Sequence, residues 1–470
     1  MITFQDFEEA QDKKSFILAA IMKHKNSEDY QIAKDADEYD AQKNVTINNY
    51  LQVMYTMSGS PVVDFTASNA KIASNFYHRM IVQRTTYLLG NGVVFNDEKT
   101  KEKLGDDFDR VIFDLTTKAL KHKVAYGFWN FDRLIPFKFT EFVPLCDEET
   151  SVLRAGIRFW QLSDEKPMYI VLYEEDGYTK YRKGKEGDTD ILTEVQPKKK
   201  YIQEVSYTEA DGETVTGEFN YTSLPIIPLW GNKLHQSTLI GTREAIDSYD
   251  LVRSGFANDL SDVAQIYWIV ENAGGMEEDD LARFRDRLKI NHIAAATTQD
   301  GASIRPYTQD IPYNARRAFL EDIKAQIYED FGALDVHQVS AASTNDHLQA
   351  AYQSIDEEAD DLEYQVSLFI TQLLDLVGIE DDYPTYKRNR IANQKEQTDM
   401  VLSAADYLDE ETVLKHLPFI TVDEVQDILE KKQEEAEARL QMIPQMPAEP
   451  PEEEAEETEE EEEPEVDEEP

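Results

Sequence analysis

Residues 245–275 read AIDSYDLVRSGFANDLSDVAQIYWIVENAGG, and the interpretation of the whole chain starts from this stretch. Its apolar residues recur at steps of three, four and seven, the spacing of one face of an amphipathic helix. They are Ile246, Tyr249, Phe256, Leu260, Val263, Tyr267 and Val270. The opposite face carries Asp247, Asp250, Asp259 and Asp262. The pattern predicts one long helix, over about 238–272, that stops at Gly274 and Gly275.

The chain as a whole is strongly acidic, with 94 Asp and Glu against 47 Lys and Arg in 470 residues. Residues 448–470 hold 15 acidic and no basic residues, and subtracting them from the net charge of −47 leaves −32 on the remainder. Such a surface does not attract DNA, because affinity for phosphates comes from Lys and Arg. Two readings stay open, which are simple solubility and a surface that a polyanion passes without sticking.

The chain carries one cysteine, Cys146, which excludes an intramolecular disulfide and fits a reducing compartment. We interpret it as a buried structural thiol. No run of about 18 apolar residues is present, so we expect no membrane span. The first residues, MITFQDFEEAQDKKSF, lack a basic segment followed by an apolar run, so we expect no secretory signal.

The first half of the chain predicts one α+β domain over residues 1–235. Helical periodicity covers 2–24, 68–90 and 106–127, with Ser68 as a cap and Gly90 as a stop. From about Trp129 the pattern changes to alternating segments rich in Tyr, Val and Ile, which predict strands. Hairpin turns are expected at Asp176-Gly177 and Asp211-Gly212.

The second half predicts helices around two irregular segments. A hairpin is expected within KINHIAAATTQDGASIRPY, residues 289–307, around Asp300-Gly301. Helices over 312–332 and 347–378 flank the small, polar, aperiodic stretch 333–346, which predicts a loop. Further elements are a short strand in 383–391, helices within 393–440, and a Pro- and Glu-rich tail, 441–470, expected to be disordered.

The sequence shows no signature of catalysis or of a cofactor. It contains no GxxxxGK[ST], HExxH or CxxC motif, and its eight histidines lack metal-ligand spacing. The aspartates of 247–262 could hold Mg²⁺ as in a nuclease, but no Lys or His accompanies them on that helix. A solvated acidic face is favoured, and we predict a protein that is not an enzyme, with no cofactor and no metal site.

Six stretches, in this order along the chain, resemble the portal proteins of tailed double-stranded DNA bacteriophages, in the subgroup of long-tailed phages of Gram-positive hosts. They are NAKIASNFYHRMIVQRTTYLLGNGVVF (69–95), HKVAYGFWNFD (122–132), LPIIPLWGNK (224–233), AIDSYDLVRSGFANDLSD (245–262), STNDHLQAAY (343–352) and YKRNRIANQKEQ (386–397). The most specific part is IDSYD followed by Ala257, Asn258 and Asp259. One departure is that STNDHLQAAY lacks the Ser-Gly pair expected at the start of the helix after the loop.

The resemblance implies a ring-forming α+β portal fold, with a mixed wing domain, a long-helix stem, a small β-hairpin clip and a helical crown. The implied parts are the first part of the wing (1–235), a stem helix (236–272), the clip (273–311), a second stem helix (312–332), the tunnel loop (333–346), a long wing helix and short strand (347–392), the crown (393–440) and the disordered acidic tail (441–470).

The resemblance also implies a function. Twelve subunits would surround a channel at one capsid vertex, through which double-stranded DNA is packaged and ejected. The implied partners are the terminase large subunit, a neck adaptor, and the major capsid and scaffolding proteins, with no membrane. The location would be the virion, and the host cytoplasm during assembly. Alternatives are an acidic adaptor or scaffold that forms no ring, and a metal-dependent phosphoesterase.

The resemblance implies roles for four sets of residues. Acidic residues on the channel wall would let DNA slide, because they neutralise no phosphates. Candidates to face the channel are Asp247, Asp250, Asp259 and Asp262. Candidates for subunit packing are Ile246, Tyr249, Phe256, Leu260, Val263 and Tyr267. Tunnel-loop candidates are Val336, His337, Gln338, Val339, Ser340, Ser343, Thr344 and Asn345. Clip residues that would meet DNA or a partner, or else carry ordinary solvated charge, are Arg285, Arg287, Lys289, His292 and Arg305.

Overall fold

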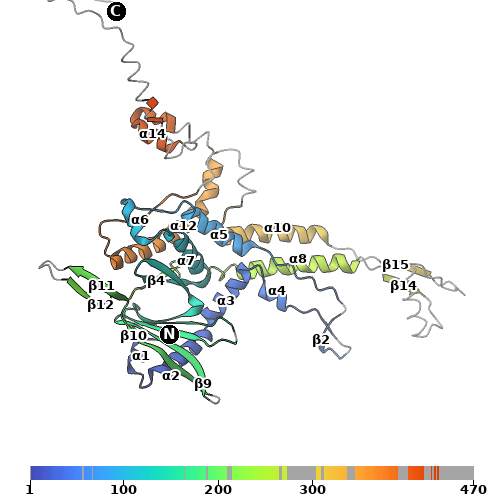
Figure 1. The fold of residues 1–470 in the computed structure, drawn as a ribbon. Coiled ribbons are helices and arrows are strands. Elements are labelled where there is room, and N and C mark those ends of the chain that lie inside the picture. The colour runs from blue at the N-terminus through green and yellow to red at the C-terminus, as the bar shows by residue number, and fades with distance from the viewer. Residues whose placement is uncertain are drawn as a thin grey trace, which may run out of the picture. The chain divides into compact units, whose positions relative to one another are not determined.

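The computed structural model has two compact units, Met1–Asn389 and Arg390–Pro470, and each is described by itself (Figure 1). The residues that the structure describes are 2–55, 58–65, 67–163, 165–186, 189–208, 214–263, 267–271, 303–307, 312–335, 345–389, 398, 401–417, 425, 428–429 and 431–432. Within them the first unit has an α+β fold. No described helix is both long and apolar enough to span a bilayer.

The chain begins with three helices, α1 (Phe4–Glu9), α2 (Lys13–Lys25) and α3 (Glu28–Asp40). The single helix predicted over 2–24 is therefore wrong. The break falls at Asp12, whose carboxylate accepts the Lys14 N–H at 3.0 Å and caps α2. An aspartate at this position stabilises a new helix start better than it continues the old helix.

A five-stranded antiparallel sheet follows, in the order β10-β9-β8-β7-β6. Its strands are β6 (Phe142–Cys146), β7 (Leu153–Trp160), β8 (Tyr169–Glu174), β9 (Gly177–Glu186) and β10 (Thr189–Lys199). Helices α1 and α2 bury Phe7 and Ile17 against it. The hairpin predicted at Asp176-Gly177 is present, with Glu174 paired to Gly177. Gly177 has φ +139°, a backbone conformation that favours glycine.

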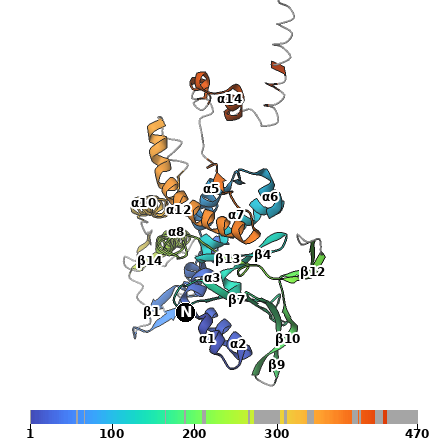
Figure 2. The ribbon, with the colours of Figure 1, turned by 90° about the vertical axis from the view of Figure 1, so that its left-hand side faces the viewer.

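A three-stranded sheet, β13-β4-β5, forms the centre of the unit, with β4 (Val124–Asn130) between β5 (Arg133–Lys138) and β13 (Ile226–Trp230). The turn η1 (Phe139–Glu141) leads from it to β6. Helices α7 (Phe108–His122) and α12 (Asn345–Val377) contribute to the main core beside this sheet (Figure 2). Helix α12 agrees with the periodicity of the sequence. The helix predicted over 106–127 is wrong beyond His122, because Lys123 has φ +83°, which ends α7, and Val124–Asn130 forms β4 instead.

The helix predicted over 68–90 is shorter than expected, because α5 spans only Phe76–Leu89. Residues 68–75 are not helical, and the N-cap of α5 is Asn75 instead of the predicted Ser68. The smaller elements nearby are α4 (Val45–Asn49), β1 (Val53–Tyr55), β2 (Pro61–Val63), β3 (Val93–Val94) and α6 (Glu98–Leu104). Strand β3 pairs with β16 (Thr385–Tyr386), the short strand expected in 383–391.

The opening stretch forms helix α8 (Arg243–Val263) and then strand β14 (Tyr267–Glu271), so a single helix to residue 272 is wrong. The sequence IYWIV at 266–270 is aromatic and β-branched, which favours a strand once a partner is present. That partner is β15 (Ser303–Tyr307). The hairpin expected inside 289–307 is therefore corrected, since its described part pairs with β14; Asp300-Gly301 lies outside the described residues.

The remaining described elements are two paired strands, helix α10 and short helices of the second unit. Strands β11 (Ile202–Thr208) and β12 (Thr214–Phe219) pair with each other, and the turn at Asp211-Gly212 between them lies outside the described residues. Helix α10 spans Tyr313–Asp330, with Pro312 at its cap. In the second unit the structure describes η2 (Ala405–Tyr407) and α14 (Glu410–His416), which lies within the predicted helical region 393–440. The tail 441–470 lies outside the described residues.

Candidate functional site

Helices α8 and α10 lie side by side and run antiparallel, and the β14–β15 pair lies beyond one end of them (Figure 1). With 21 and 18 residues, they are about 31 and 27 Å long at 1.5 Å per residue. Near the β14–β15 end, the rings of Phe256 and Tyr313 lie 5.9 Å apart and Asp259 forms an ion pair with Arg316. The two helices are thus joined by a specific polar and aromatic contact.

At the other end of the pair, α5 inserts its first residue between the two helices. The ring of Phe76 lies 5.0 Å from that of Tyr249 on α8 and 6.0 Å from that of Tyr328 on α10, nearly perpendicular to both. Edge-to-face aromatic contacts of this kind contribute about 0.5–1.5 kcal/mol beyond area burial. The base of the helix pair is therefore fixed to the main core.

A ladder of three hydrogen bonds joins α8 to the segment before α5. The backbone N–H groups of Ala70, Ile72 and Ser74 donate to side chains of α8 at distances of 2.6, 3.0 and 2.9 Å. The acceptors, in the same order, are Asn258 Oδ1, Ser254 Oγ and Asp250 Oδ1. We call this the polar ladder.

The geometry of the polar ladder follows from two repeats. Every second N–H of an extended segment points the same way, and two residues advance about 6.6 Å. On a helix, side chains four residues apart lie on one face and advance 6.0 Å. Asp250, Ser254 and Asn258 have this spacing and are all buried. The ladder explains why 68–75 is not helical, because its N–H groups are already bonded to α8.

The polar ladder corrects the role expected for Asp250, which cannot face a channel because it is 0% exposed within its own subunit. Its second carboxylate oxygen accepts a hydrogen bond from Asn44 Nδ2 at 2.9 Å. Burial raises the pKa of Asp250, and the hydrogen bonds from Asn44 and Ser74 oppose that rise. Asp250 lies on the acidic face predicted from the sequence, but in the structure it connects α8 to Asn44 and Ser74 of the same subunit.

The other three aspartates of α8 are placed as follows. Asp247 accepts hydrogen bonds from the hydroxyls of Tyr39 and Thr46, the latter at 2.7 Å, and is only half-buried. Asp259 pairs with Arg316, as described above. The side chain of Asp262 lies outside the described residues. Two of the four therefore hold contacts within the subunit while remaining partly accessible.

The candidates for subunit packing divide in a similar way. Ile246 is buried in the main core and Tyr249 packs against it, so both serve the fold of this subunit. Phe256 is half-buried against α10, whereas Leu260 is 53% exposed. The side chains of Val263 and Tyr267 lie outside the described residues, and Tyr267 belongs to β14 instead of the helix.

A clamp from α5 holds the chain where α10 ends. Gln83 bonds both backbone groups of Leu334, donating from Nε2 to the carbonyl at 2.9 Å and accepting its N–H at 3.1 Å. Arg84, which is buried, donates to the Phe331 carbonyl at 2.5 Å, stacks over the Phe331 ring and pairs with Glu358 at 3.0 Å. Sequence reasoning did not find this clamp, because its partners are about 250 residues apart.

The clamp lies at the start of the expected tunnel loop. Gly332, with φ +64°, ends α10, and the Ala333 N–H bonds the Tyr328 carbonyl at 2.9 Å, as in a Schellman cap. Leu334 then enters a small core with Tyr352 of α12. Both ends of the loop are thus anchored within this subunit.

Most tunnel-loop and clip candidates lie outside the described residues. These are Val336, His337, Gln338, Val339, Ser340, Ser343, Thr344, Arg285, Arg287, Lys289 and His292. Asn345 is the first residue of α12, and Arg305 is placed in β15 by its backbone. Within the described part of the chain, no group of three or more His, Cys, Asp or Glu side chains could hold a metal ion.

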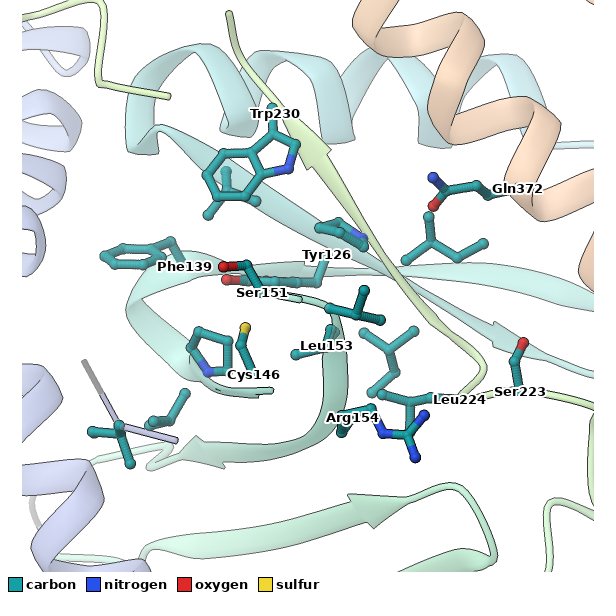
Figure 3. Close-up of a pocket in the computed structure, with 18 of the residues that line it drawn as sticks. Tyr126, Phe139, Cys146, Ser151, Leu153, Arg154, Ser223, Leu224, Trp230 and Gln372 are labelled. Carbon is teal, nitrogen blue, oxygen red and sulfur yellow. The ribbon is translucent and has the colours of Figure 1, made fainter. Parts of the chain in front are cut away.

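The structure also contains a largely apolar cavity of about 820 Å³ in the first unit (Figure 3). Tyr126, Trp230 and Cys146 line it, and Arg154 at its wall pairs with Glu175 at 3.0 Å. Burial raises the pKa of the Cys146 thiol, so this half-buried group is a poor nucleophile at neutral pH. No local sequence signal could have found the cavity, since its lining comes from many separate segments.

Comparisons with known proteins identify relatives of the chain. A family model described as phage portal protein, SPP1 Gp6-like, matches residues 19–438. A portal protein of Clostridium phage phiCD119 is 26% identical over 410 residues, which cover 78% of this chain and 86% of the relative. A portal protein of Bacillus phage SPP1 is 24% identical over 407 residues, covering 78% and 76%.

The comparison with solved structures matches chains in two structures of gene transfer agent (GTA) particles. One is the virion of the native particle, with 11% identity, a TM-score of 0.41, and coverage of 72% of this chain and 88% of that chain. The other is the neck of an empty particle with C6 symmetry, with 10% identity, a TM-score of 0.39 and the same coverage.

Proposed function

Because the family model spans residues 19–438, this chain belongs to the SPP1 Gp6-like phage portal proteins, and we propose that twelve copies form a ring around a DNA channel at one capsid vertex. The ring would be part of the virion and would assemble in the host cytoplasm. DNA would enter through it during packaging and leave through it during ejection.

The observation that carries the proposal is the helix pair α8–α10, fixed at its base by Phe76 and the polar ladder. A closed ring needs heterologous contacts, so each subunit must offer one apolar surface to the next. Leu251 and Leu260 of α8 are 42% and 53% exposed, although neighbouring stripe residues serve the subunit's own core. These side chains are available for the adjacent subunit.

We assign the acidic channel wall mainly to α10. This helix exposes four acidic residues and one basic residue, Arg317, whereas Asp250 of α8 is buried. The exposed acids are Glu321, Asp322, Glu329 and Asp330. Asp247 and Asp259 remain secondary candidates because both are only partly accessible. A wall of this charge lets DNA slide, since it releases no counterions from the phosphates.

The other parts take roles that the family membership supports. Residues 273–311 are proposed as the clip, which would bind the terminase large subunit and later the neck adaptor. Residues 336–344 are proposed as the tunnel loop, with the clamp of Gln83 and Arg84 at its base. The wing and the crown, 393–440, would contact the major capsid and scaffolding proteins.

Mass and shape test the ring directly. Twelve copies of 54.1 kDa give about 650 kDa. We expect light scattering to report this mass and electron microscopy to show a toroid with a central hole. A protein that stays monomeric or dimeric in physiological salt, with DNA added, would contradict the ring and favour the adaptor. Metal-dependent DNA cleavage lost on Asp259→Asn would favour the phosphoesterase.

A deletion tests the tunnel loop separately. Replacing 336–344 with a short Gly-Ser linker should leave ring mass unchanged, because Leu334 and Tyr352 keep both anchors. DNA packaging or retention should fall. A matched control shortens the segment 209–213 between β11 and β12. Normal packaging by the 336–344 variant would remove the assigned role while leaving the ring intact.

A further inference from the structure

One stretch of this highly charged chain has no charge at all. Residues 44–63, NVTINNYLQVMYTMSGSPVV, lie between Lys43 and Asp64 and contain no Asp, Glu, Lys or Arg, although 30% of the chain is charged. The stretch forms α4 and the β1–β2 hairpin. Figure 1 shows the hairpin standing away from the two large sheets, below α8. We call the described residues 50–55 and 58–65 the arm.

The base of the arm is fixed to the body of its own subunit. Asn44 is buried, donates to Asp250 at 2.9 Å and accepts the Ile47 N–H at 3.1 Å, which caps α4. Ile47 is 2% exposed. The arm therefore projects from a well-defined anchor on α8.

The arm exposes several large apolar side chains among its described residues. Its strands have three residues each and pair with each other, Val53 opposite Val63. An isolated two-stranded hairpin is at best marginally stable in water, and its open edges invite pairing. Phe65 is 91% exposed, and Leu51, Val53 and Val62 are 51%, 47% and 42% exposed. Apolar surface of this kind marks a contact site.

We propose that the arm docks on the adjacent copy of this chain and buries Leu51, Val62 and Phe65 there; this rests on the proposed ring. The lack of charge on the arm indicates which partner it contacts. Two bodies with a formal charge of −47 each repel one another, so contact costs least where charge is absent. Charged residues are depleted from the cores of protein interfaces for the same reason. An uncharged arm from each subunit gives a heterologous contact that repeats around a ring.

Photo-crosslinking tests where the arm lies. Phe65→p-benzoylphenylalanine is made in the full chain, and the assembled protein is irradiated. We expect covalent dimers and higher oligomers, with mass spectrometry placing the linked residue on a second copy. Crosslinks confined to one subunit, or formed only with a different protein, would overturn the proposal.

Assembly measurements give a second test. The double variant Val62→Asp and Phe65→Asp should raise the protein concentration at which half the rings dissociate by at least tenfold. The control is Phe131→Asp, which changes another exposed aromatic, 61% exposed, in the turn between β4 and β5. If the double variant and wild type assemble equally well, the proposed docking of the arm is wrong, but the proposed ring is not contradicted. If wild type forms no ring, a crosslink between two copies still supports the arm and its absence refutes it.

Discussion

The clamp at the end of α10 allows a sharp prediction, because two adjacent residues of α5 hold one short segment. We consider Gln83→Leu, Arg84→Met and the double variant. The first removes both hydrogen bonds to the backbone of Leu334. The second removes the hydrogen bond to the Phe331 carbonyl, the cation–π contact and the ion pair with Glu358.

The magnitudes follow from these contacts. Two partly buried hydrogen bonds contribute about 1 kcal/mol each, so Gln83→Leu should cost about 2 kcal/mol. A hydrogen bond from a buried guanidinium contributes about 1.5–3 kcal/mol. The Glu358 ion pair adds little, because that carboxylate is 40% exposed and is rehydrated when Arg84 is lost. Arg84→Met should therefore cost about 2–3 kcal/mol.

Amide hydrogen exchange is the suitable assay, because the expected opening is local. The Ala333 and Leu334 amides should exchange roughly 30-fold faster in Gln83→Leu and roughly 30- to 140-fold faster in Arg84→Met, since 1.4 kcal/mol corresponds to a factor of ten. The amides of β4 should be unchanged. The double variant should cost less than the sum of the singles, because both side chains hold the same segment. The control is Arg79→Met, on the exposed side of α5.

Two results would refute the reasoning. If exchange at Ala333 and Leu334 is unchanged in Arg84→Met, the guanidinium does not hold the end of α10. If the amides of β4 and of residues 333–334 all exchange faster in the variants, Gln83 and Arg84 stabilise the whole core and not only the end of α10. Strict additivity of the two variants would show that they hold separate segments.

Three further predictions concern the body of the subunit. Burial raises the pKa of Asp37. The His122 ring, whose Nε2 lies 2.9 Å from Asp37 Oδ1, and the ammonium group of Lys121 outweigh burial and hold this pKa well below its usual range. Because a lowered pKa stabilises the fold above the unfolded value near 4, Asp37→Asn should cost about 1 kcal/mol at pH 7 and progressively less below pH 4 in chemical denaturation. Gly127→Ala should cost about 1–3 kcal/mol by calorimetry, because the new methyl would lie 2.5 Å from the Phe369 ring. Cys146 should react with Ellman's reagent more slowly than free cysteine at pH 8, because burial raises its pKa; an equal rate would contradict this.

The sequence predicted the elements whose stability is local. Helices α7, α10 and α12 and the β8–β9 hairpin carry their own periodicity and turn residues, so a window of 15 residues contains the signal. The errors lie where distant residues decide. The segment 68–75 is not helical because α8 accepts the N–H groups of Ala70, Ile72 and Ser74. Residues 267–271 form a strand because 303–307 pair with them.

The candidate site was predictable only in outline. The amphipathic pattern of α8 identified a helix with two distinct faces, yet it could not show that Asn44 and Ser74 cover one aspartate. Polar residues at helical spacing look alike whether they face water or an N–H donor. The sequence pattern of α10 predicts a helix but does not show which of its acidic residues are exposed.

The polar ladder has a consequence for how accurately α5 is positioned. The N–H groups of its donor segment repeat about every 6.6 Å if the chain is extended, and the acceptors on α8 repeat about every 6.0 Å. The two repeats therefore match only over a few hydrogen bonds. A further rung toward α5 would set the Phe76 N–H against Ile246, which offers no acceptor, and α5 begins at that residue. Sliding the segment by one residue would turn these three N–H groups away from α8 and break every hydrogen bond of the ladder. The ladder therefore helps to fix where α5 begins along α8.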